Sequence, residues 1–439
     1  MSEKKDSLHN ALDPEVVVIG VGFVGLTLAM SLCQKGIKVL GIDSNLNLVS
    51  ELSRGETNIV EDGLVDLLQS SLRNGLFEIQ GTQIALKRSE RPITFIVTVG
   101  TPLKNGGIDQ LSVEQSLLQI GSNLLEGDLL ILRSTLAIGT CRELVKPFLD
   151  KLERKVYLAM CPERTIEGNA LAEIDNLPQV IGGIDEQSTE RAKEFFSKIC
   201  NKIVLVSSIE AAELLKLANN TFRDLMFAFS NEIAMLSQQI GLSAKEVIQA
   251  ANFEYPRSRI ALPGPSGGPC LEKDPWILYH SGQRFGVEML LSGSSRRVNE
   301  SAPYRYVIEI ISELTTRREK LRVGLLGLSF KGNPPVNDTR GSFAIELLKR
   351  LDNYNIEFYG FEPAGQIQTK VARLNLKEDI FELFENSDVV VIATNHLEFQ
   401  HLERALNQIN SERSMTLIDM WNIVDRKTLP EFIDYRSWG

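Results

Sequence analysis

The sequence has few of the residues from which metal sites and disulfide frameworks are built. Its five cysteines are spread over 439 residues without a Cys-x-x-Cys pair, and its four histidines form no cluster with cysteine at zinc-binding spacing. These absences argue against a small disulfide-stabilised fold and against a metal site. They favour a reducing, cytoplasmic setting.

Excess basic charge and long apolar runs are also missing. The 57 acidic residues outnumber the 47 basic ones and give a net charge of −10, whereas a nucleic-acid-binding protein would show a basic face. The longest apolar run, residues 16–30, contains three glycines and is too short to span a bilayer. Residues 1–14 are polar and lack the apolar core of a signal peptide, so we expect a disordered tail there. We expect neither nucleic acid nor membrane as a partner.

The length and the residue pattern predict more than one domain, because 439 residues are too many for a single ordinary core. Strand-like apolar runs alternate with helical patterns over residues 15–206 and again over residues 319–439, while residues 207–318 are helical in pattern. We therefore expect an α/β protein with two Rossmann-like doubly wound domains. A long central helix and a small helical region would join them.

The first predicted strand leads into a glycine-rich turn typical of dinucleotide-binding domains. Residues 16–19 are followed by Gly20-x-Gly22-x-x-Gly25, by a helical pattern and by a second strand that ends in Asp43. The first glycine permits the tight turn, the second lets a pyrophosphate approach the backbone, and the third lets the helix pack closely on the strand. An acid after the second strand can accept hydrogen bonds from both ribose hydroxyls, which favours NAD over NADP. The alternative is a glycine turn in an α/β domain that binds nothing.

Residues 207–240 predict one long helix at the start of the central region. They contain neither proline nor glycine, and their apolar residues recur at helical spacing, which corresponds to roughly 45–50 Å of helix. Ser207 and Glu210 have the spacing of a capping box at its start. So long a helix usually separates domains or forms a subunit interface.

Several polar residues could carry chemistry, and each has a simpler explanation. Lys216 and Asn220 share a face of the long helix, where Lys216 could merely pair with Glu213 in a solvated stripe. Glu163 and Glu167 follow a predicted strand and could form an ordinary charged loop. The hydroxyls of residues 134–140 also follow a strand and could serve only as helix caps.

Cys270 could be either a catalytic nucleophile or an ordinary packing residue. It lies in the segment GPSGGPCLEKDP, behind two glycines and close to Lys273 and Asp274. A cysteine on such a turn could be accessible and activated as a nucleophile. Free cysteines are, however, usually buried packing residues, and the loop alone leaves both possibilities open.

Taken in order, eight segments of the chain resemble the UDP-glucose/GDP-mannose dehydrogenase family of nucleotide-sugar 6-dehydrogenases over about residues 14–425. They are the glycine fingerprint and the segments GTPL, STLAIG, CPERTIEG, ELLKLANN, GGPCLEKDP, GLSFKG and DTRGS. The resemblance implies an NAD-binding domain at 15–206, a central domain for dimerisation and catalysis at 207–318, and a UDP-sugar-binding domain at 319–439. It also implies NAD as cofactor, a UDP-sugar as small-molecule substrate, and a cytoplasmic homodimer or higher homo-oligomer.

The implied reaction oxidises the sugar C6 alcohol to a carboxylate with two NAD⁺, for polysaccharide precursor synthesis. An aldehyde forms first and is captured by a cysteine; the thiohemiacetal is oxidised to a thioester, and water releases the uronate. By motif, Cys270 corresponds to the nucleophile. Lys216 corresponds to the lysine that stabilises developing oxyanions, and Asn220 helps to hold that oxygen. Asp274 corresponds to the residue that positions or activates water.

The resemblance assigns further residues around these. Glu163 and Thr135 match residues near the hydrolytic water, with Glu163 a candidate base for thioester hydrolysis. Arg257 matches an arginine that contacts substrate in its own or a neighbouring subunit. The implied cofactor-binding residues are Gly20, Gly22, Phe23, Val24, Gly25, Asp43, Thr101, Thr135, Glu167 and Arg340. The implied substrate-binding residues are Glu163, Arg164, Lys216, Asn220, Arg257, Gly267 and Lys331.

Some details depart from the commonest family pattern. The loop before the cysteine, GPSGGPC, is one residue shorter than the usual form, and Arg340 comes nine positions after Lys331, where a spacing of seven is common. Trp421 stands where many relatives carry arginine. The tripeptide at residues 162–164 is PER, where UDP-glucose and GDP-mannose enzymes usually have PEF. It resembles the branch that acts on UDP-N-acetylhexosamines such as UDP-N-acetylglucosamine or UDP-N-acetylmannosamine.

Three other functions are kept as alternatives. One is UDP-glucose 6-dehydrogenase. Another is a two-electron β-hydroxyacid-type dehydrogenase, which shares the NAD domain and the central helix and needs no nucleophilic cysteine. A third is a sensing protein with a decayed site, which the survival of the cysteine, lysine, asparagine and aspartate disfavours.

Overall fold

The computed structural model describes residues 12–104, 107–318, 320–365, 367, 371–409 and 414–439. The tail predicted to be disordered therefore lies outside the described residues, except for residues 12–14. The chain divides into two compact units, one of residues 1–219 and 280–285 and the other of residues 220–279 and 286–439.

The first unit is built on a mostly parallel sheet. Its strands are β1 (Val16–Ile19), β2 (Val39–Ile42), β3 (Phe77–Gln80), β4 (Thr94–Val97), β7 (Leu129–Leu132), β8 (Tyr157–Met160), β9 (Gln179–Gly183) and β10 (Ile203–Leu205). Their order is β3-β2-β1-β4-β7-β8-β9-β10, and the first six are parallel, in the arrangement of a dinucleotide-binding fold. β9 runs antiparallel to β8, so the beginning of β9 lies beside the carboxyl end of β8.

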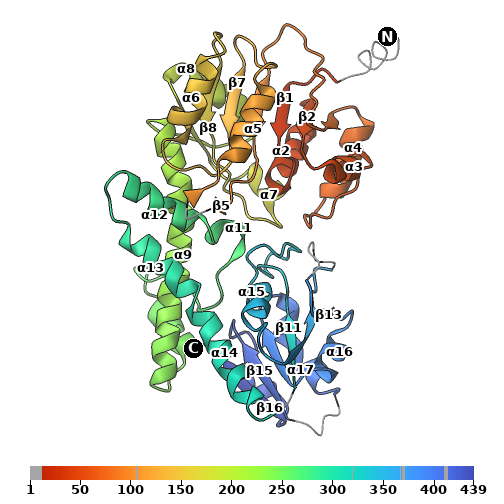
Figure 1. Ribbon diagram of the computed structural model, residues 1–439, viewed down its shortest axis with the longest axis vertical. Helices are drawn as coiled ribbons and strands as arrows, with labels where there is room; N and C mark the ends of the chain where they lie inside the picture. The colour runs from red at the N-terminus through yellow and green to blue at the C-terminus, as the bar shows by residue number, and fades with distance from the viewer. Residues whose placement is uncertain (1–11, 105–106, 319, 366, 368–370, 410–413) are drawn as a thin grey trace. The chain divides into compact units, whose positions relative to one another are not determined.

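Successive side chains along each strand point to opposite faces of this sheet, and both faces are covered by hydrophobic side chains. Val16 and Val18 belong to one buried cluster, while Val17 and Ile19 belong to the other. The helices that cover the two faces are visible in Figure 1. They are α2 (Phe23–Gln34), α3 (Leu46–Ser53), α4 (Leu64–Arg73), α5 (Leu111–Ile120), the π-helical turn η1 (Cys141–Val145), α6 (Lys146–Asp150), α7 (Ala170–Ile174) and α8 (Glu186–Phe196). A short hairpin, β5 (Leu103–Lys104) with β6 (Gly107–Ile108), lies between β4 and α5 in the chain.

The predicted long helix is present as α9 (Ile209–Gln239), a single helix of 31 residues. At 1.5 Å per residue it is about 46 Å long. Ser207 was predicted to cap the start of this helix, but the hydroxyl that does so belongs to the next residue, Ser208. It accepts the Ala211 N–H at 3.2 Å. Glu210, expected to complete the capping box, instead forms an ion pair with Arg142.

The second unit contains a six-stranded, fully parallel sheet. Its strands are β11 (Leu321–Leu326), β12 (Ile356–Phe361), β13 (Leu374–Leu376), β14 (Val389–Ile392), β15 (Met415–Asp419) and β16 (Ile433–Ser437). The order β13-β12-β11-β14-β15-β16 repeats the topology of the first six strands of the other sheet. The expectation of a second Rossmann-like fold is therefore confirmed, although β13 and β16 were not predicted.

Helices precede this second sheet in the chain and also cover its faces (Figure 1). They are α10 (Ala244–Asn252), α11 (Gly268–Leu271), α12 (Asp274–Arg284), α13 (Leu290–Asn299), α14 (Ala302–Thr315), α15 (Phe343–Arg350), α16 (Ile380–Glu385), η2 (Leu397–His401), α17 (Leu402–Leu406) and η3 (Arg426–Thr428). α14 and α15 pack on one face through Val307, Ile311 and Leu347, and α16 and α17 pack on the other face through Leu383 and Leu406.

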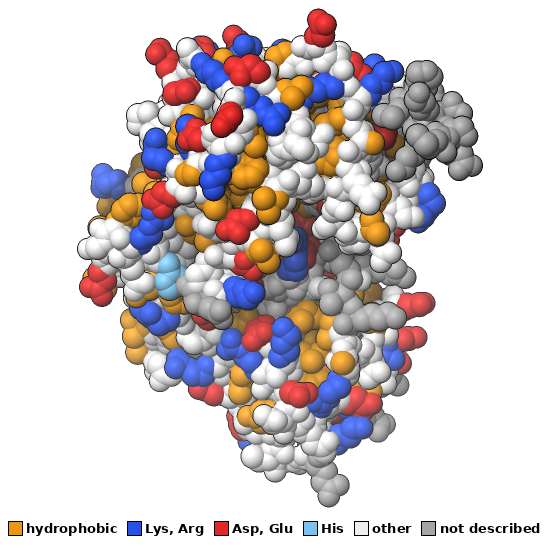
Figure 2. Space-filling model, turned by 45° about the horizontal axis from the view of Figure 1, so that its top comes forward, with side chains coloured by type: hydrophobic (Ala, Val, Ile, Leu, Met, Phe, Trp, Pro, Cys, Tyr) orange, Lys and Arg blue, Asp and Glu red, His pale blue; other side chains and the backbone are white. Residues whose placement is uncertain are grey.

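The surface carries charge of both signs. On the face in Figure 2, acidic and basic side chains are intermingled. Within the described residues, no helix is both long and apolar enough to cross a bilayer. The same part of the chain contains no group of three or more His, Cys, Asp or Glu residues that could hold a metal ion.

Candidate active site

The glycine turn after β1 has the geometry of a phosphate-binding turn. Gly20 has φ of +88°, and a Cβ added at Gly25 would overlap the Gly20 carbonyl oxygen, so both positions require glycine. A Cβ added at Gly22 would have no protein atom within 4 Å. No side chain caps the start of α2 at Phe23 and Val24, so the helix N-terminus can receive a pyrophosphate.

Asp43, at the carboxyl end of β2, completes this turn. One of its carboxylate oxygens accepts the Val21 N–H at 2.9 Å and the other accepts the Asn45 N–H at 2.8 Å. Each carboxylate oxygen has a second lone pair, and the side chain is only half-buried. The carboxylate can therefore also accept the two hydroxyls of a ribose, and the residues of this turn fit NAD.

The second sheet has an acid in the corresponding place, but its surroundings differ. The Glu362 carboxylate follows β12 and accepts the Leu328 and Ser329 N–H groups at 2.7 and 2.8 Å. Its other oxygen lies 2.8 Å from Nε2 of the fully buried His396. Burial raises the pKa of Glu362, but the contact with His396 and the backbone N–H groups lower it overall. This buried pair leaves the second acid less accessible to a ribose than Asp43.

The loops after β4 and β7 present hydroxyl groups at the same edge of the first sheet. The Thr101 hydroxyl donates to the backbone oxygen of Thr135 at 2.7 Å, and the Ser134 hydroxyl donates to that of Val99 at 2.7 Å. The alternative of a helix cap is not supported at Thr140, whose side chain makes no capping bond to the helical turn that follows it. The hydroxyls of Thr101 and Ser134 instead hold the two loops together.

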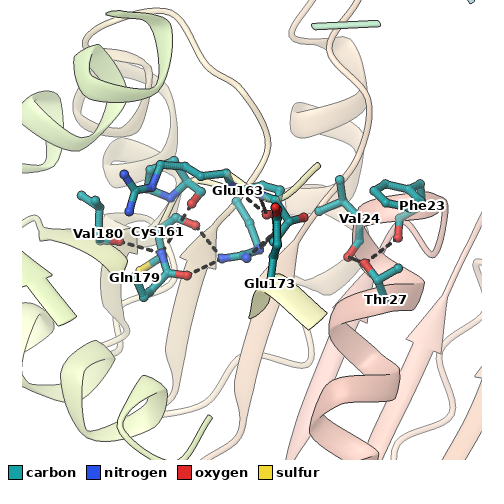
Figure 3. Close-up of polar contacts among 12 residues, drawn as sticks. Phe23, Val24, Thr27, Cys161, Glu163, Glu173, Gln179 and Val180 are labelled. Carbon is teal, nitrogen blue, oxygen red and sulfur yellow. Dashed lines mark hydrogen bonds and ion pairs between the residues drawn. The ribbon is translucent and has the colours of Figure 1, made fainter. Parts of the chain in front are cut away.

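A buried polar cluster lies at the carboxyl ends of β7 and β8 (Figure 3). Two nitrogen atoms of Arg133 contact the same oxygen of the Glu163 carboxylate, with Nε at 2.8 Å and Nη2 at 2.5 Å from Oε2. The Arg133 Nη1 atom donates to the backbone oxygen of Cys161 at 3.2 Å and to the Gln179 side chain at 2.8 Å. Sequence reasoning singled out Glu163 but missed Arg133 and Gln179.

The environment of Glu163 favours its ionised form. Burial would raise the pKa of its carboxyl group, but Arg133, the Thr165 backbone N–H and Lys216 outweigh burial and lower the pKa to about 2. Burial raises the pKa of the neighbouring Cys161 thiol, so that thiol stays neutral. The cluster therefore holds one fixed carboxylate against cationic groups.

Lys216 on α9 belongs to the same part of the first unit. Its ammonium group donates to the backbone oxygen of Glu163, and its side chain is buried. Glu213 is fully buried and accepts the N–H groups of Gly139 at 2.6 Å and Cys141 at 2.8 Å. The expected alternative of a solvated stripe with a Glu213–Lys216 pair is therefore wrong, because both side chains are buried against other partners.

The second unit contains a compact polar group around Asp274, at the start of α12. The fully buried Asp274 carboxylate accepts the Asn220 side-chain N–H at 2.6 Å, and its other oxygen lies 3.1 Å from the ammonium group of Lys273. Asn220 is itself buried on α9. The two residues that sequence reasoning placed near the reacting oxygen and the water are thus hydrogen-bonded to each other.

Cys270 lies on the single-turn helix α11, four residues before Asp274. All five cysteines are among the described residues, and Cys270 is exposed while the other four are buried. A Cβ on Gly267 would overlap the backbone oxygen of Gly341, and Gly268 has φ of +89°. The loop therefore needs both glycines to present its cysteine.

The remaining predicted site residues have these positions. Arg164 donates to the backbone oxygen of Pro178, Glu167 lies in the loop between β8 and α7, and the Lys331 ammonium group lies 5.6 Å from the centre of the Phe330 ring. The Arg340 guanidinium group contacts Asp338, and the Arg257 guanidinium group lies 4.6 Å from the centre of the Tyr255 ring. The roles assigned to these residues stay predictions.

The fold and the glycine turn define a dinucleotide-binding protein whose second sheet has the same strand topology as the first six strands of the NAD-binding sheet. The chain belongs to the UDP-glucose/GDP-mannose dehydrogenase family, whose NAD-binding, central and UDP-binding domain models match residues 14–200, 210–301 and 324–426. The predicted family, fold class and cofactor are confirmed. The protein is an NAD-dependent nucleotide-sugar dehydrogenase that acts on a UDP-sugar.

Several nucleotide-sugar dehydrogenases are similar to this chain over almost its whole length. A Methanocaldococcus jannaschii protein named UDP-N-acetyl-D-mannosamine dehydrogenase is 30% identical over 425 residues, which span 95% of this chain and 94% of that protein. The structure of a UDP-N-acetyl-mannosamine dehydrogenase from Staphylococcus aureus matches with a TM-score of 0.82 and 27% identity, covering 97% of this chain and 98% of that one. A UDP-glucose dehydrogenase from Pyrobaculum islandicum also matches with a TM-score of 0.82, at 25% identity and with the same two coverages.

Proposed function

We propose that the protein oxidises the C6 alcohol of a UDP-N-acetylhexosamine to the uronate through a covalent intermediate on Cys270. The observation that carries this proposal is the exposed cysteine of α11, which lies four residues before Asp274 of the buried Asn220–Asp274 pair in the same unit. The product would be an activated uronic acid, the kind of precursor that glycosyltransferases use in polysaccharide synthesis.

The proposed chemistry assigns each step to groups of this chain. The glycine turn after β1, the N-terminus of α2 and Asp43 would hold NAD⁺, which would supply the hydride acceptor for both oxidations. The Cys270 thiolate adds to the C6 aldehyde, and the Lys216 ammonium group with the Asn220 amide stabilises the resulting oxyanion. After the second oxidation, water attacks the thioester, Asp274 accepts a proton from that water, and the thiolate leaves. One alcohol, two NAD⁺ and one water thus give one carboxylate, two NADH and three protons.

The substrate class rests on the PER tripeptide and on the names of the relatives. Arg164, its third residue, directs its side chain to Pro178 within the loop between β8 and β9, where a phenylalanine could make no such hydrogen bond. UDP-glucose remains the main alternative, because the Pyrobaculum islandicum structure is as similar in fold. Trp421, which replaces a common arginine, packs its ring against Gly264, where an added Cβ would lie 2.7 Å from the ring.

The purified protein is expected to form two NADH per acetylated UDP-sugar consumed. The measurement follows NADH absorbance with UDP-N-acetylmannosamine, UDP-N-acetylglucosamine, UDP-N-acetylgalactosamine, UDP-glucose and GDP-mannose, and quantifies the remaining sugar nucleotide. Two NADH with UDP-glucose alone would keep the mechanism and reject the substrate class. One NADH per sugar would favour a two-electron dehydrogenase and reject the thioester chemistry.

We also propose that α9 forms a homodimer interface. Phe222, Phe229 and Leu236 are seven residues apart on this helix and are 60%, 49% and 59% exposed. Seven-residue spacing places large apolar side chains in one stripe, which soluble helices normally bury against a partner.

A Phe229→Glu variant is expected to dissociate this dimer at least about 30-fold more readily, because a carboxylate would be buried in an apolar interface. Light scattering after size exclusion, over a range of protein concentrations, measures the change. Leu397→Glu places the same charge at a residue of η2 that is 55% exposed, and should leave the mass unchanged. A wild-type protein that is monomeric at all concentrations would reject the interface.

A further inference from the structure

Arg133 and Glu163 form a buried ion pair beside the proposed catalytic lysine. Arg133 immediately follows β7 and Glu163 lies three residues after β8, so the pair joins the carboxyl ends of two neighbouring strands. Both side chains are almost fully buried. A buried arginine is costly unless its N–H groups are satisfied, and Arg133 directs donors to Glu163, Cys161 and Gln179.

The Glu163 carboxylate is saturated with hydrogen-bond donors. Its Oε2 atom accepts two guanidinium N–H groups of Arg133. Its Oε1 atom accepts the backbone N–H groups of Arg164 at 2.7 Å and Thr165 at 2.6 Å. A carboxylate offers about four acceptor sites. These four N–H groups and the Thr165 side chain, which also forms a hydrogen bond with the carboxylate, use all of them, so a catalytic water would have to displace one of these donors.

The same residue meets the proposed catalytic lysine through its backbone. The Lys216 ammonium group donates to the Glu163 backbone oxygen, not to its carboxylate. The Glu163 carboxylate accepts the backbone N–H groups of the next two residues, Arg164 and Thr165, and thereby fixes the backbone of this segment. Arg133 holds that carboxylate in place. The geometry thus connects Arg133 to the position of Lys216.

We propose that Arg133 is a positioning residue that locks Glu163 as a permanently ionised anchor for Lys216, so that Glu163 carries no proton in thioester hydrolysis. This inference rests on the proposed function for the role of Lys216. It removes Glu163 from the candidate bases and leaves Asp274 as the group that accepts the proton of water.

Charged and titratable groups around the carboxylate support a fixed ionisation. Arg133 comes from the end of β7, Lys216 from α9, and Arg164 from the same loop. The Cys161 and Cys200 thiols face Arg133, and burial raises the pKa of both, so they stay neutral. With three cations near one carboxylate, the lowered pKa of Glu163 follows from the arrangement.

The first test needs no enzyme activity and measures urea unfolding between pH 5 and 8. In the wild type, the lowered pKa of Glu163 gives stability that is complete above its ordinary pKa and is lost only as the pH falls toward 2. In Arg133→Gln, burial should raise the pKa of Glu163 above its unfolded value. The urea midpoint of this variant should therefore fall as pH rises from 5 to 8, and adding Glu163→Gln should abolish that slope.

The second test measures kcat and KM over the same pH range with the UDP-sugar that the substrate panel identifies. Arg133→Gln should lower kcat roughly 100-fold at pH 7, the size of a displaced catalytic group, and leave the affinity for NADH unchanged. Its kcat should vary with pH below 8 as Glu163 titrates, and the double variant should lose this dependence. Arg133→Lys keeps the charge and should recover part of the rate.

Arg88→Gln is the matched control, because Arg88 forms an ion pair with the buried Asp128 at the opposite end of β7. It should lower the urea midpoint without changing kcat or its pH profile. The proposal is overturned if the slope of Arg133→Gln persists without Glu163, or if wild-type kcat shows an acid limb that Glu163→Gln alone removes. If no UDP-sugar yields NADH, the proposed function fails, while the unfolding test still decides whether Arg133 fixes the charge of Glu163.

Discussion

Replacing Cys270 by alanine is expected to lower the rate of uronate formation by about three orders of magnitude or more, as the loss of a covalent nucleophile does in other enzymes. Without the sulfur, the C6 aldehyde cannot be held as a thiohemiacetal, so the second oxidation loses its substrate. Because Cys270 is exposed on a one-turn helix, the substitution removes little packing. The unfolding midpoint and the affinity for NADH should therefore stay as in the wild type.

Two measurements separate this result from simple damage to the fold. In the wild type, acid quenching during turnover followed by peptide mass spectrometry should find the sugar acyl group on the peptide that contains Cys270. A limiting amount of iodoacetamide should modify the same residue before the four buried cysteines. A Cys270→Ala enzyme that keeps its rate would instead identify a two-electron dehydrogenase.

The two sheets could be predicted because their strands are apolar runs of the kind that a parallel sheet buries on both faces. The antiparallel direction of β9 could not be predicted, because the apolar pattern of a short buried strand is the same whether it runs parallel or antiparallel to its neighbour. β16 has alternating half-buried and exposed residues at the edge of its sheet, which makes its apolar pattern weak. β13 has only three residues, too few for a periodic signal.

Sequence motifs predicted the candidate site residues that belong to them, such as Glu163. They did not predict the interaction partners of those residues, which come from distant parts of the chain and become neighbours only in the folded protein. The sequence motifs did not point to Arg133, although an arginine beside a run of buried apolar residues needs an acid or several carbonyls. Its partner Glu163 lies 30 residues further on, and only the adjacency of β7 and β8 brings them together. Gln179 joins them because β9 is reversed and begins at that edge.

Two glycine substitutions should distinguish cofactor binding from folding at the turn after β1. In Gly25→Ala the new Cβ would overlap the Gly20 carbonyl oxygen and lie 2.7 Å from the Thr98 hydroxyl. The backbone of α2 would have to move away from β1, which costs about 3 kcal/mol or more in a well-packed core. We expect a lower urea midpoint for this variant and no detectable NAD binding.

In Gly22→Ala the new Cβ would meet no protein atom within 4 Å, and φ of −66° suits alanine, so the protein should unfold at the wild-type urea concentration. The methyl group would nevertheless stand where the pyrophosphate approaches the N-terminus of α2. We expect the affinity for NADH, measured by its fluorescence, to fall roughly 100-fold, which corresponds to about 2.7 kcal/mol. Unchanged affinity in Gly22→Ala would place the pyrophosphate elsewhere, whereas a parallel loss of stability would show that this glycine is needed for the turn itself. The difference in stability expected between the two variants follows from what each Cβ would face: the Gly20 carbonyl oxygen and the Thr98 hydroxyl for Gly25, and open space for Gly22.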